Sequence, residues 1–331
     1  MPGGFQMRLG AVSSTMILGG ALLSLAACQP KPEPPPGALL GWAYPQGVKS
    51  NLPPYPAGPQ HIPGSAVTYA GEALNKGAGP PDWFPDSHPP APEVVAQGRK
   101  GLMACAECHQ IGGGGTLGSP NLAGLSEDYI VQQVREFREG RRASWKANWP
   151  TNQDMIKVAK TVTDEELAAA AAYYAALPYK PRVRVVEGET APATKPNYYG
   201  WLDLDPGKPP QALNGQVIEV AEDGPRMLLA DPNAVIVVHA PIGATARGEA
   251  LAASGGGNGQ ACAACHGQGL KGSPVAPPLA GRSAAYLARQ LLDIKTGARN
   301  GPLAAQMQGP ARGLNDEEIR DLAVYAASLK P

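Results

Sequence analysis

Two five-residue segments carry the side chains whose types and spacing are best suited to chemistry. Both are Cys-x-x-Cys-His motifs, one at residues 105–109 and the other at residues 262–266. This spacing is typical of covalent haem c attachment, in which two thiols add to the porphyrin vinyl groups and the adjoining imidazole binds the iron. We therefore predict two covalently bound haem c groups. Their expected thiols are Cys105, Cys108, Cys262 and Cys265, and their expected iron-ligating imidazoles are His109 and His266.

Paired cysteines have other uses. A thioredoxin-type Cys-x-x-Cys needs no adjoining histidine and belongs to a βαβ pattern, which neither motif has. A zinc site formed by all four cysteines would leave both histidines without a role. Two haem groups account for all six side chains, so the motifs favour one-electron redox chemistry.

The sixth iron ligand decides whether such a centre carries electrons or meets substrates. Met155 lies 46 residues after His109, and Met307 lies 41 residues after His266, each in a polar stretch before the last expected helix. A thioether there would close the iron and raise its potential relative to two histidine ligands. We predict Met155 and Met307 as the sixth ligands. Three unpaired histidines remain as alternatives, namely His61, His88 and His239.

The surroundings of the two motifs form an internal repeat. A shift of 157 residues pairs Pro120 with Pro277, Tyr129 with Tyr286 and Arg142 with Arg299. After a five-residue difference in loop length, a shift of 152 pairs Met155 with Met307. Repetition of this kind indicates two copies of one structural unit. We place the two domains at residues 93–180 and 245–331.

The periodicity of each repeat predicts a mainly α fold, with three main helices around each haem. The first helix runs into the motif. The second covers about 126–139 in the first copy and 283–296 in the second, with apolar residues on one face. The last begins at a capping box, at residues 163–166 or 315–318. Domains this small bury little apolar surface alone, so a bound porphyrin would supply much of the core.

The remaining segments differ in composition. Residues 181–244 contain three β-type runs, at 216–220, 226–230 and 234–238, and predict a small antiparallel hairpin or meander. Residues 28–92 are rich in proline, with 17 of the chain's 36 prolines between residues 29 and 92. We interpret residues 29–40 as a flexible tether and the rest as an irregular arm lying against a domain or a partner.

The first 28 residues resemble a bacterial lipoprotein signal. Arg8 precedes an apolar stretch that ends in Leu25-Ala26-Ala27-Cys28. We predict that residues 1–27 are a signal peptide and that Cys28 carries lipid, which places the protein in the bacterial periplasm on the inner or outer membrane. An ordinary secretory signal with a free thiol is the alternative. Lys and Arg number 28, as do Asp and Glu, and no basic stripe indicates nucleic acid.

The motifs, the segment from Pro120 to Gly124, Met155 and the tyrosine-bearing last helix resemble class I cytochromes c. The tandem arrangement is similar to the dihaem members of that class. The resemblance implies that the carbonyls of Pro120 and Pro277 orient the haem-ligating histidines. It also implies that four further side chains bind haem propionates, whereas ordinary helix packing and surface charge are the alternative for them. These four are Tyr129, Tyr286, Arg142 and Arg299.

These observations predict a membrane-anchored dihaem carrier that passes single electrons between other redox proteins and has no catalytic residue. A fixed cytochrome subunit of a periplasmic dehydrogenase complex is one alternative. A haem enzyme resembling a peroxidase is another, and it would require one iron with an open position.

Overall fold

The computed structural model describes residues 1–4, 35–45, 55–75, 79–197, 201–256 and 259–331. Residues 35–331 form one compact unit. Cys28 and all but the first four residues of the predicted signal peptide lie outside the described residues. Within the described ranges, no helix combines the length and apolar character needed to cross a bilayer.

The first repeat consists mainly of helices, as predicted. They are α2 (Glu93–Ala96), α3 (Ala106–His109), α4 (Glu127–Arg138), α5 (Pro150–Thr161) and α6 (Asp164–Ala176). α4 packs against both α5 and α6. The helix α6 begins with the predicted capping box, in which Thr163 accepts from the Glu166 N–H and Glu166 accepts from the Thr163 N–H. These bonds satisfy N–H groups that the first turn leaves free.

The second repeat has the same order of helices. They are α8 (Ala244–Ser254), α9 (Ala263–His266), α10 (Ala284–Lys295), α11 (Pro302–Arg312) and α12 (Asp316–Ser328), with a short 3-10 turn η4 (Gln268–Leu270) after α9. α8 and α12 pack closely because Gly248 lacks a side chain. A Cβ on Gly248 would lie 2.0 Å from the carbonyl oxygen of Asp321.

The polar stretches around Met155 and Met307 are helices rather than the predicted loops. Met155 lies in α5 and Met307 in α11. Each of these helices has a proline at its start, Pro150 or Pro302. Proline is favoured at the first helical position because its fixed φ suits the helix and its missing N–H would have no partner there. Apart from the short helical turn at the motif, each repeat therefore has one helix more than the three main helices predicted, and this helix carries the methionine.

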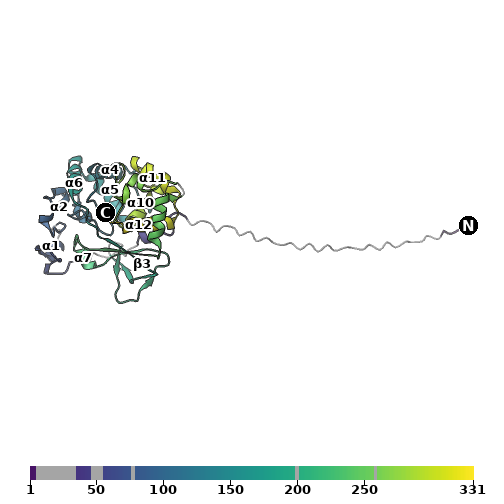
Figure 1. The fold of residues 1–331 in the computed structure, drawn as a ribbon, viewed down its shortest axis with the longest axis horizontal. Coiled ribbons are helices and arrows are strands. Elements are labelled where there is room, and N and C mark those ends of the chain that lie inside the picture. The colour runs from purple at the N-terminus through teal and green to yellow at the C-terminus, as the bar shows by residue number, and fades with distance from the viewer. Residues whose placement is uncertain (5–34, 46–54, 76–78, 198–200, 257–258) are drawn as a thin grey trace. The chain divides into compact units, whose positions relative to one another are not determined.

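The segment between the repeats contains a three-stranded sheet in the order β3 (Val183–Glu187), β9 (Ile236–Ala240) and β8 (Ile218–Ala221). β8 and β9 are antiparallel, as predicted, whereas β3 pairs with β9 in parallel. Two further antiparallel pairs join β4 (Thr190–Ala191) to β7 (Gln211–Ala212) and β5 (Thr194–Pro196) to β6 (Leu202–Leu204). In Figure 1, β3 lies below α10 and α12.

The predicted strand at residues 226–230 is wrong. Residues Gly224–Leu228 form the helix α7. Asp223 caps this helix by accepting from the Arg226 N–H, and Pro225 occupies its first turn. A cap and a proline at the start favour a helix over a strand even where the following residues are apolar.

The proline-rich segment begins to pack earlier than predicted. The segment contains the strands β1 (Pro59–Gln60) and β2 (Tyr69–Ala70) and the helix α1 (Gly71–Asn75). Before them lies the 3-10 turn η1 (Gly41–Ala43), which contacts α10. Asp316, at the start of α12, accepts hydrogen bonds of 2.9 Å from both Gly37 N and Leu39 N. Residues 35–40 are thus folded onto the second repeat instead of forming a tether, while residues 29–34 lie outside the described residues.

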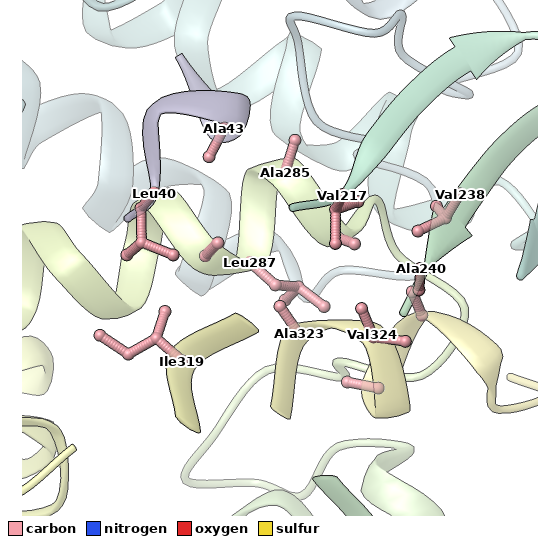
Figure 2. Close-up of a cluster of buried hydrophobic side chains, with 14 of the residues drawn as sticks. Leu40, Ala43, Val217, Val238, Ala240, Ala285, Leu287, Ile319, Ala323 and Val324 are labelled. Carbon is pink, nitrogen blue, oxygen red and sulfur yellow. The ribbon is translucent and has the colours of Figure 1, made fainter. Parts of the chain in front are cut away.

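The larger apolar core joins this segment, the second repeat and the sheet. Figure 2 shows Leu40 and Ala43 with side chains from α10, α12 and the strands. Leu40 and Ile319 are both fully buried in it. A separate core fills the first repeat, around Tyr174, Ile130 and Leu167. The two Cys-x-x-Cys-His motifs belong to different cores, since Cys105 packs in the smaller and Cys262 in the larger.

Candidate functional site

Each Cys-x-x-Cys-His motif forms one turn of helix. His109 N donates to Cys105 O at 3.0 Å, and His266 N donates to Cys262 O at 2.9 Å. A helical turn places residues three and four apart on one face, so both thiols and the imidazole can address a single ligand. The four motif cysteines are free thiols rather than disulfides. Burial raises the pKa of Cys105 to about 11, so this thiol is neutral near pH 7.

Both motif histidines are held through Nδ1. His109 Nδ1 lies 2.9 Å from the carbonyl oxygen of Pro120, and His266 Nδ1 lies 2.8 Å from that of Pro277. A carbonyl only accepts, so Nδ1 carries the proton in each ring. Burial lowers the pKa of both imidazoles, which favours the neutral form. The lone pair on Nε2 is then free, as metal ligation requires.

The first motif opens onto a cavity. Cys105, Cys108 and His109 line it together with Met155 from α5. The remaining walls are largely apolar and come from α4, α5, α6 and the loop before α4, including Leu122, Leu125, Ile130, Val134, Val158, Val162, Leu167 and Ala170. The structure therefore brings the two thiols, the imidazole and the methionine predicted for the first haem to one largely apolar space, which suits a porphyrin ring.

The second motif is characterised by the burial of its histidine and by the position of Met307. His266 is 6% exposed, and its Nε2 is buried without a hydrogen-bond partner among the described residues. An unpaired buried polar atom is costly, and ligation of a metal would satisfy it. Met307 lies on α11 and packs in a small cluster with Ile294, Ala304 and Ala311. It thus lies on the helix that corresponds to the helix of Met155, but in another apolar cluster than Cys262.

The predicted tyrosines and arginines form hydrogen bonds across the two repeats. Arg142 Nη2, in the first repeat, donates to Tyr286 OH at 3.1 Å and to Gln290 Oε1 at 3.2 Å. In the second repeat, Arg299 Nη2 donates to Tyr129 OH at 3.0 Å and to Gln133 Oε1 at 2.7 Å. The two arginines also form an antiparallel bridge through their backbones.

This network adjoins the first cavity and contains donors without acceptors. Five of its side chains line the cavity, namely Tyr129, Gln133, Arg142, Tyr286 and Gln290. Gln133 Nε2 and Arg299 Nε are buried without partners among the described residues. Burial alone would raise the pKa of Tyr129, but Arg299 and Arg142 hold it below its usual value. The local field is therefore positive, and carboxylates such as haem propionates would find free donors here.

The two glutamines were not predicted as site residues. Their signal was the repeat itself, since Gln133 and Gln290 pair under the shift of 157 residues. Asp293 was missed as well. It reaches the first cavity from α10 of the second repeat and accepts from Trp145 N at 2.7 Å. Burial raises the pKa of Asp293 to about 6. Only the docking of the repeats places it there.

The three histidines kept as alternative ligands have other partners or surroundings. His88 Nε2 lies 3.0 Å from Asp82, and His61 Nδ1 lies 3.2 Å from the Thr68 hydroxyl. His239 lies on β9, in the sheet. The structure thus shows no approach of these histidines to the cavity that Met155 lines.

Comparison with known proteins relates these features to a family. The model of the family described as cytochrome c matches residues 95–177 and 245–330, about half of the chain. The chain is 28% identical over 230 residues to the thiosulfate dehydrogenase electron acceptor of Stutzerimonas stutzeri (strain A1501), covering 69% of this chain and 79% of the relative. It is 38% identical over 87 residues to cytochrome c4 of Azotobacter vinelandii, covering 24% of this chain and 41% of that protein.

A solved structure gives a similar result. The chain matches a thiosulfate dehydrogenase from Marichromatium purpuratum with a TM-score of 0.50 and 30% sequence identity. The match covers 72% of this chain and 39% of the solved chain, so the likeness concerns less than half of that protein.

Proposed function

This chain belongs to the cytochrome c family, and on that premise we propose that it is a lipid-anchored periplasmic carrier that takes electrons from a thiosulfate dehydrogenase. It is an electron carrier with two covalently bound haem c groups. A bound haem c supplies one-electron redox chemistry. The protein's own residues attach the groups, orient the ligating imidazoles and surround them with apolar side chains.

One observation carries the proposal. In both repeats, two thiols are followed by an imidazole whose Nδ1 is hydrogen-bonded to a proline carbonyl. That bond fixes the tautomer and the ring orientation and raises the basicity of Nε2. His109 and His266 are the proposed iron ligands on one side. Since the same arrangement occurs twice, the chain is built to hold two equivalent redox centres.

Met155 and Met307 are the proposed ligands on the other side. The position of Met155 in the cavity of His109 supports the first assignment, and the matching position of Met307 on α11 supports the second. Propionates of the first haem are proposed to accept from the network of Tyr129 and Arg142. Its unpartnered buried donors support that role.

The proposed electron donor rests on the relatives. Two proteins named thiosulfate dehydrogenase electron acceptor are each 28% identical to this chain, over 230 and 243 residues. The test is to mix the oxidised holoprotein with a purified thiosulfate dehydrogenase and thiosulfate, and to follow the visible spectrum by stopped flow. We expect both haems to become reduced, with no change when either the dehydrogenase or thiosulfate is omitted. A protein that dithionite reduces fully but the dehydrogenase leaves oxidised would contradict this donor.

A fixed subunit of a dehydrogenase complex is the second candidate. The match to 39% of a solved thiosulfate dehydrogenase chain favours it, because a similar domain pair is there part of a longer chain. Gel filtration after mild solubilisation separates the two. A freely exchanging carrier elutes at the mass of one chain, whereas a subunit co-elutes with its dehydrogenase.

The membrane anchor is proposed from the sequence around Cys28. Lipid on this cysteine would keep the protein with the membrane fraction, since more than one acyl chain gives stable attachment. We expect Cys28→Ser to move the haem-containing protein into the soluble periplasmic fraction. Mass spectrometry of the native N-terminus provides the direct readout, and an unmodified Cys28 in the mature protein would rule out the lipid.

A further inference from the structure

Arg282 lies between the repeats, in the loop that precedes α10. Its side chain is almost fully buried, with 5% exposure. Its Nε donates to the carbonyl oxygen of Pro278 at 2.7 Å, and its Nη1 donates to that of Asn121 at 2.7 Å. One guanidinium group thus binds one backbone carbonyl in each repeat. Two hydrogen bonds from a charged donor to fixed carbonyls hold their loops more firmly than neutral pairs would.

The two bonded residues directly follow the prolines that hold the motif histidines. Asn121 comes after Pro120, whose carbonyl lies 2.9 Å from His109 Nδ1. Pro278 comes after Pro277, whose carbonyl lies 2.8 Å from His266 Nδ1. Arg282 is therefore one peptide unit away from both histidine hydrogen bonds. If the guanidinium moved, both proline carbonyls would therefore move with it.

A second contact strengthens this bridge. The Arg282 guanidinium lies over the ring of Tyr179, 5.2 Å from the ring centroid. The Tyr179 hydroxyl donates to the carbonyl of Gly281 at 2.5 Å. Tyr179 stands at the end of the first repeat and Gly281 in the second. Cation–π contact and hydrogen bond together fix the guanidinium between the repeats.

The position breaks the internal repeat. The shift of 157 residues places Leu125 of the first repeat at the position of Arg282. Leu125 is buried and packs in the apolar core of its own repeat. The repeat fold thus accepts an apolar side chain here, and burying an arginine is costly unless its bonds are specific. Arg282 therefore uses its charge and length for contacts between the repeats, which the fold of a single repeat does not need.

We propose that Arg282 is a positioning residue that holds the proline loops of both repeats and thereby sets the reduction potentials of both haem c groups together. Its bonds keep each proline carbonyl against its imidazole, which maintains ligand basicity. Its buried positive charge favours the reduced, less positive state of each centre, and we expect this effect to exceed the opposite effect of the more basic imidazoles. The proposal rests on the two haem groups and not on the identity of the electron donor.

The test compares holoprotein variants by potentiometric titration and by NMR of the imidazole ring protons. In Arg282→Leu, which copies the residue of the first repeat, we expect the equilibrium constant for reduction to fall about tenfold at both haems, or about 59 mV for a one-electron couple. The Nδ1 protons of both histidines should exchange faster with solvent. Arg282→Lys keeps the charge but has a single donor group, so exchange should quicken at one or both rings while neither potential falls.

Arg247→Leu is the matched control. It also removes one arginine from the second repeat, but Arg247 pairs with Asp321 and its side chain is 48% exposed. We expect this variant to leave both potentials and both exchange rates near those of the unmodified protein. If Arg282→Leu does not accumulate with two haems, the exchange rates in Arg282→Lys decide. Unchanged exchange at both rings, or a potential shift confined to one haem, would overturn the proposal without affecting the test with thiosulfate dehydrogenase.

Discussion

At the scale of single residues, the two sites follow from a small set of side chains whose neighbours fix their protonation. Burial lowers the pKa of the imidazoles of His109 and His266, helped at His109 by the charge of Arg142, and a carbonyl assigns the proton to Nδ1. Before haem attachment, burial raises the pKa of the Cys105, Cys108 and Cys262 thiols, which favours their neutral form. The chemistry of each site is therefore set by few residues, which makes single substitutions informative.

Replacing Met155 or Met307 tests the sixth ligand. We expect Met155→Ala and Met307→Ala each to keep two covalent haems but to lose about half of the weak far-red absorption of methionine-ligated iron. Each should also let one haem bind carbon monoxide in the reduced state. Met227→Leu is the control, because Met227 packs against the larger core and lies 3.6 Å from Arg182. A full far-red band in either alanine variant would show that the methionine is not a ligand.

Asp293 predicts a pH dependence of stability. Burial raises its pKa to about 6, and Arg289, Arg299 and Arg142 only partly oppose this. The folded protein therefore binds this proton more tightly than the unfolded chain. The resulting stabilisation is complete below about pH 4 and is lost as pH rises through about 6, an effect on the order of 2–3 kcal/mol.

The measurement is urea unfolding of holoprotein and of Asp293→Asn between pH 4 and 7. The asparagine can still accept from Trp145 N but does not titrate. The difference in unfolding free energy between the two proteins should shift by about 2–3 kcal/mol over this range and level off above pH 7. Comparing differences cancels the opposite slope of exposed carboxylates such as Asp164, whose pKa is lowered by Arg138. A difference that does not change with pH would show that Asp293 titrates normally.

At the scale of elements, the sequence predicted what local patterns encode. The capping boxes at Thr163 and Asn315 mark the starts of α6 and α12, and both are present in the structure. The helices of Met155 and Met307 were not predicted because their residues are largely polar. Only the prolines at their first positions, Pro150 and Pro302, indicated them. Residues 226–230 were wrongly predicted as a strand because they are largely apolar, although Asp223 just before them is a helix cap. Local chemistry at element ends was more informative than hydrophobicity along them.

Contacts between distant segments could not be predicted in this way. The carboxylate of Asp316 binds Gly37 N and Leu39 N across 279 and 277 residues of sequence. No periodicity indicates such a pair, because Gly37 and Leu39 lie outside the repeats. The same holds for Asp293, which enters the first cavity only because the repeats dock.

The packed segment around η1 makes a prediction of its own. Leu40 is fully buried in the larger core (Figure 2), whereas its neighbour Leu39 is 41% exposed. Leu40→Ala should lower the unfolding free energy of the holoprotein by about 2–4 kcal/mol, because it removes buried methyl groups and leaves a cavity. Leu39→Ala, the same change one residue earlier, should cost less than about 0.5 kcal/mol. Equal effects in urea unfolding would mean that this segment does not belong to the core.

At the scale of the whole molecule, the two repeats are joined by direct hydrogen bonds between them as well as by the segment that connects them. Each arginine of the pair binds the tyrosine and glutamine of the other repeat. Gln290 accepts from both Arg142 Nη2 and Arg299 Nη1. Backbone bonds from Ala143 N to Ala298 O and from Asn300 N to Arg141 O flank this contact. The two repeats are therefore held in one body.

This shared acceptor predicts that the two arginines act together. Arg142→Leu and Arg299→Leu should each lower the unfolding free energy of the holoprotein by about 2–4 kcal/mol, because the first leaves Tyr286, and the second Tyr129 and Gln133, without the arginine donor. The double variant should lose more than the sum, since Gln290 keeps one arginine donor in each single variant and loses both donors only in the double variant. Arg247→Leu, which removes a half-exposed arginine within one repeat and leaves Asp321 paired with Arg320, should cost at most about 1 kcal/mol. Urea unfolding followed through both haem absorbance and far-UV circular dichroism provides these values.

In the double variant we expect the single transition to separate into two, one for each repeat, because the bonds that make them unfold together are gone. Strictly additive losses with one unchanged transition would show that the repeats are coupled by other contacts.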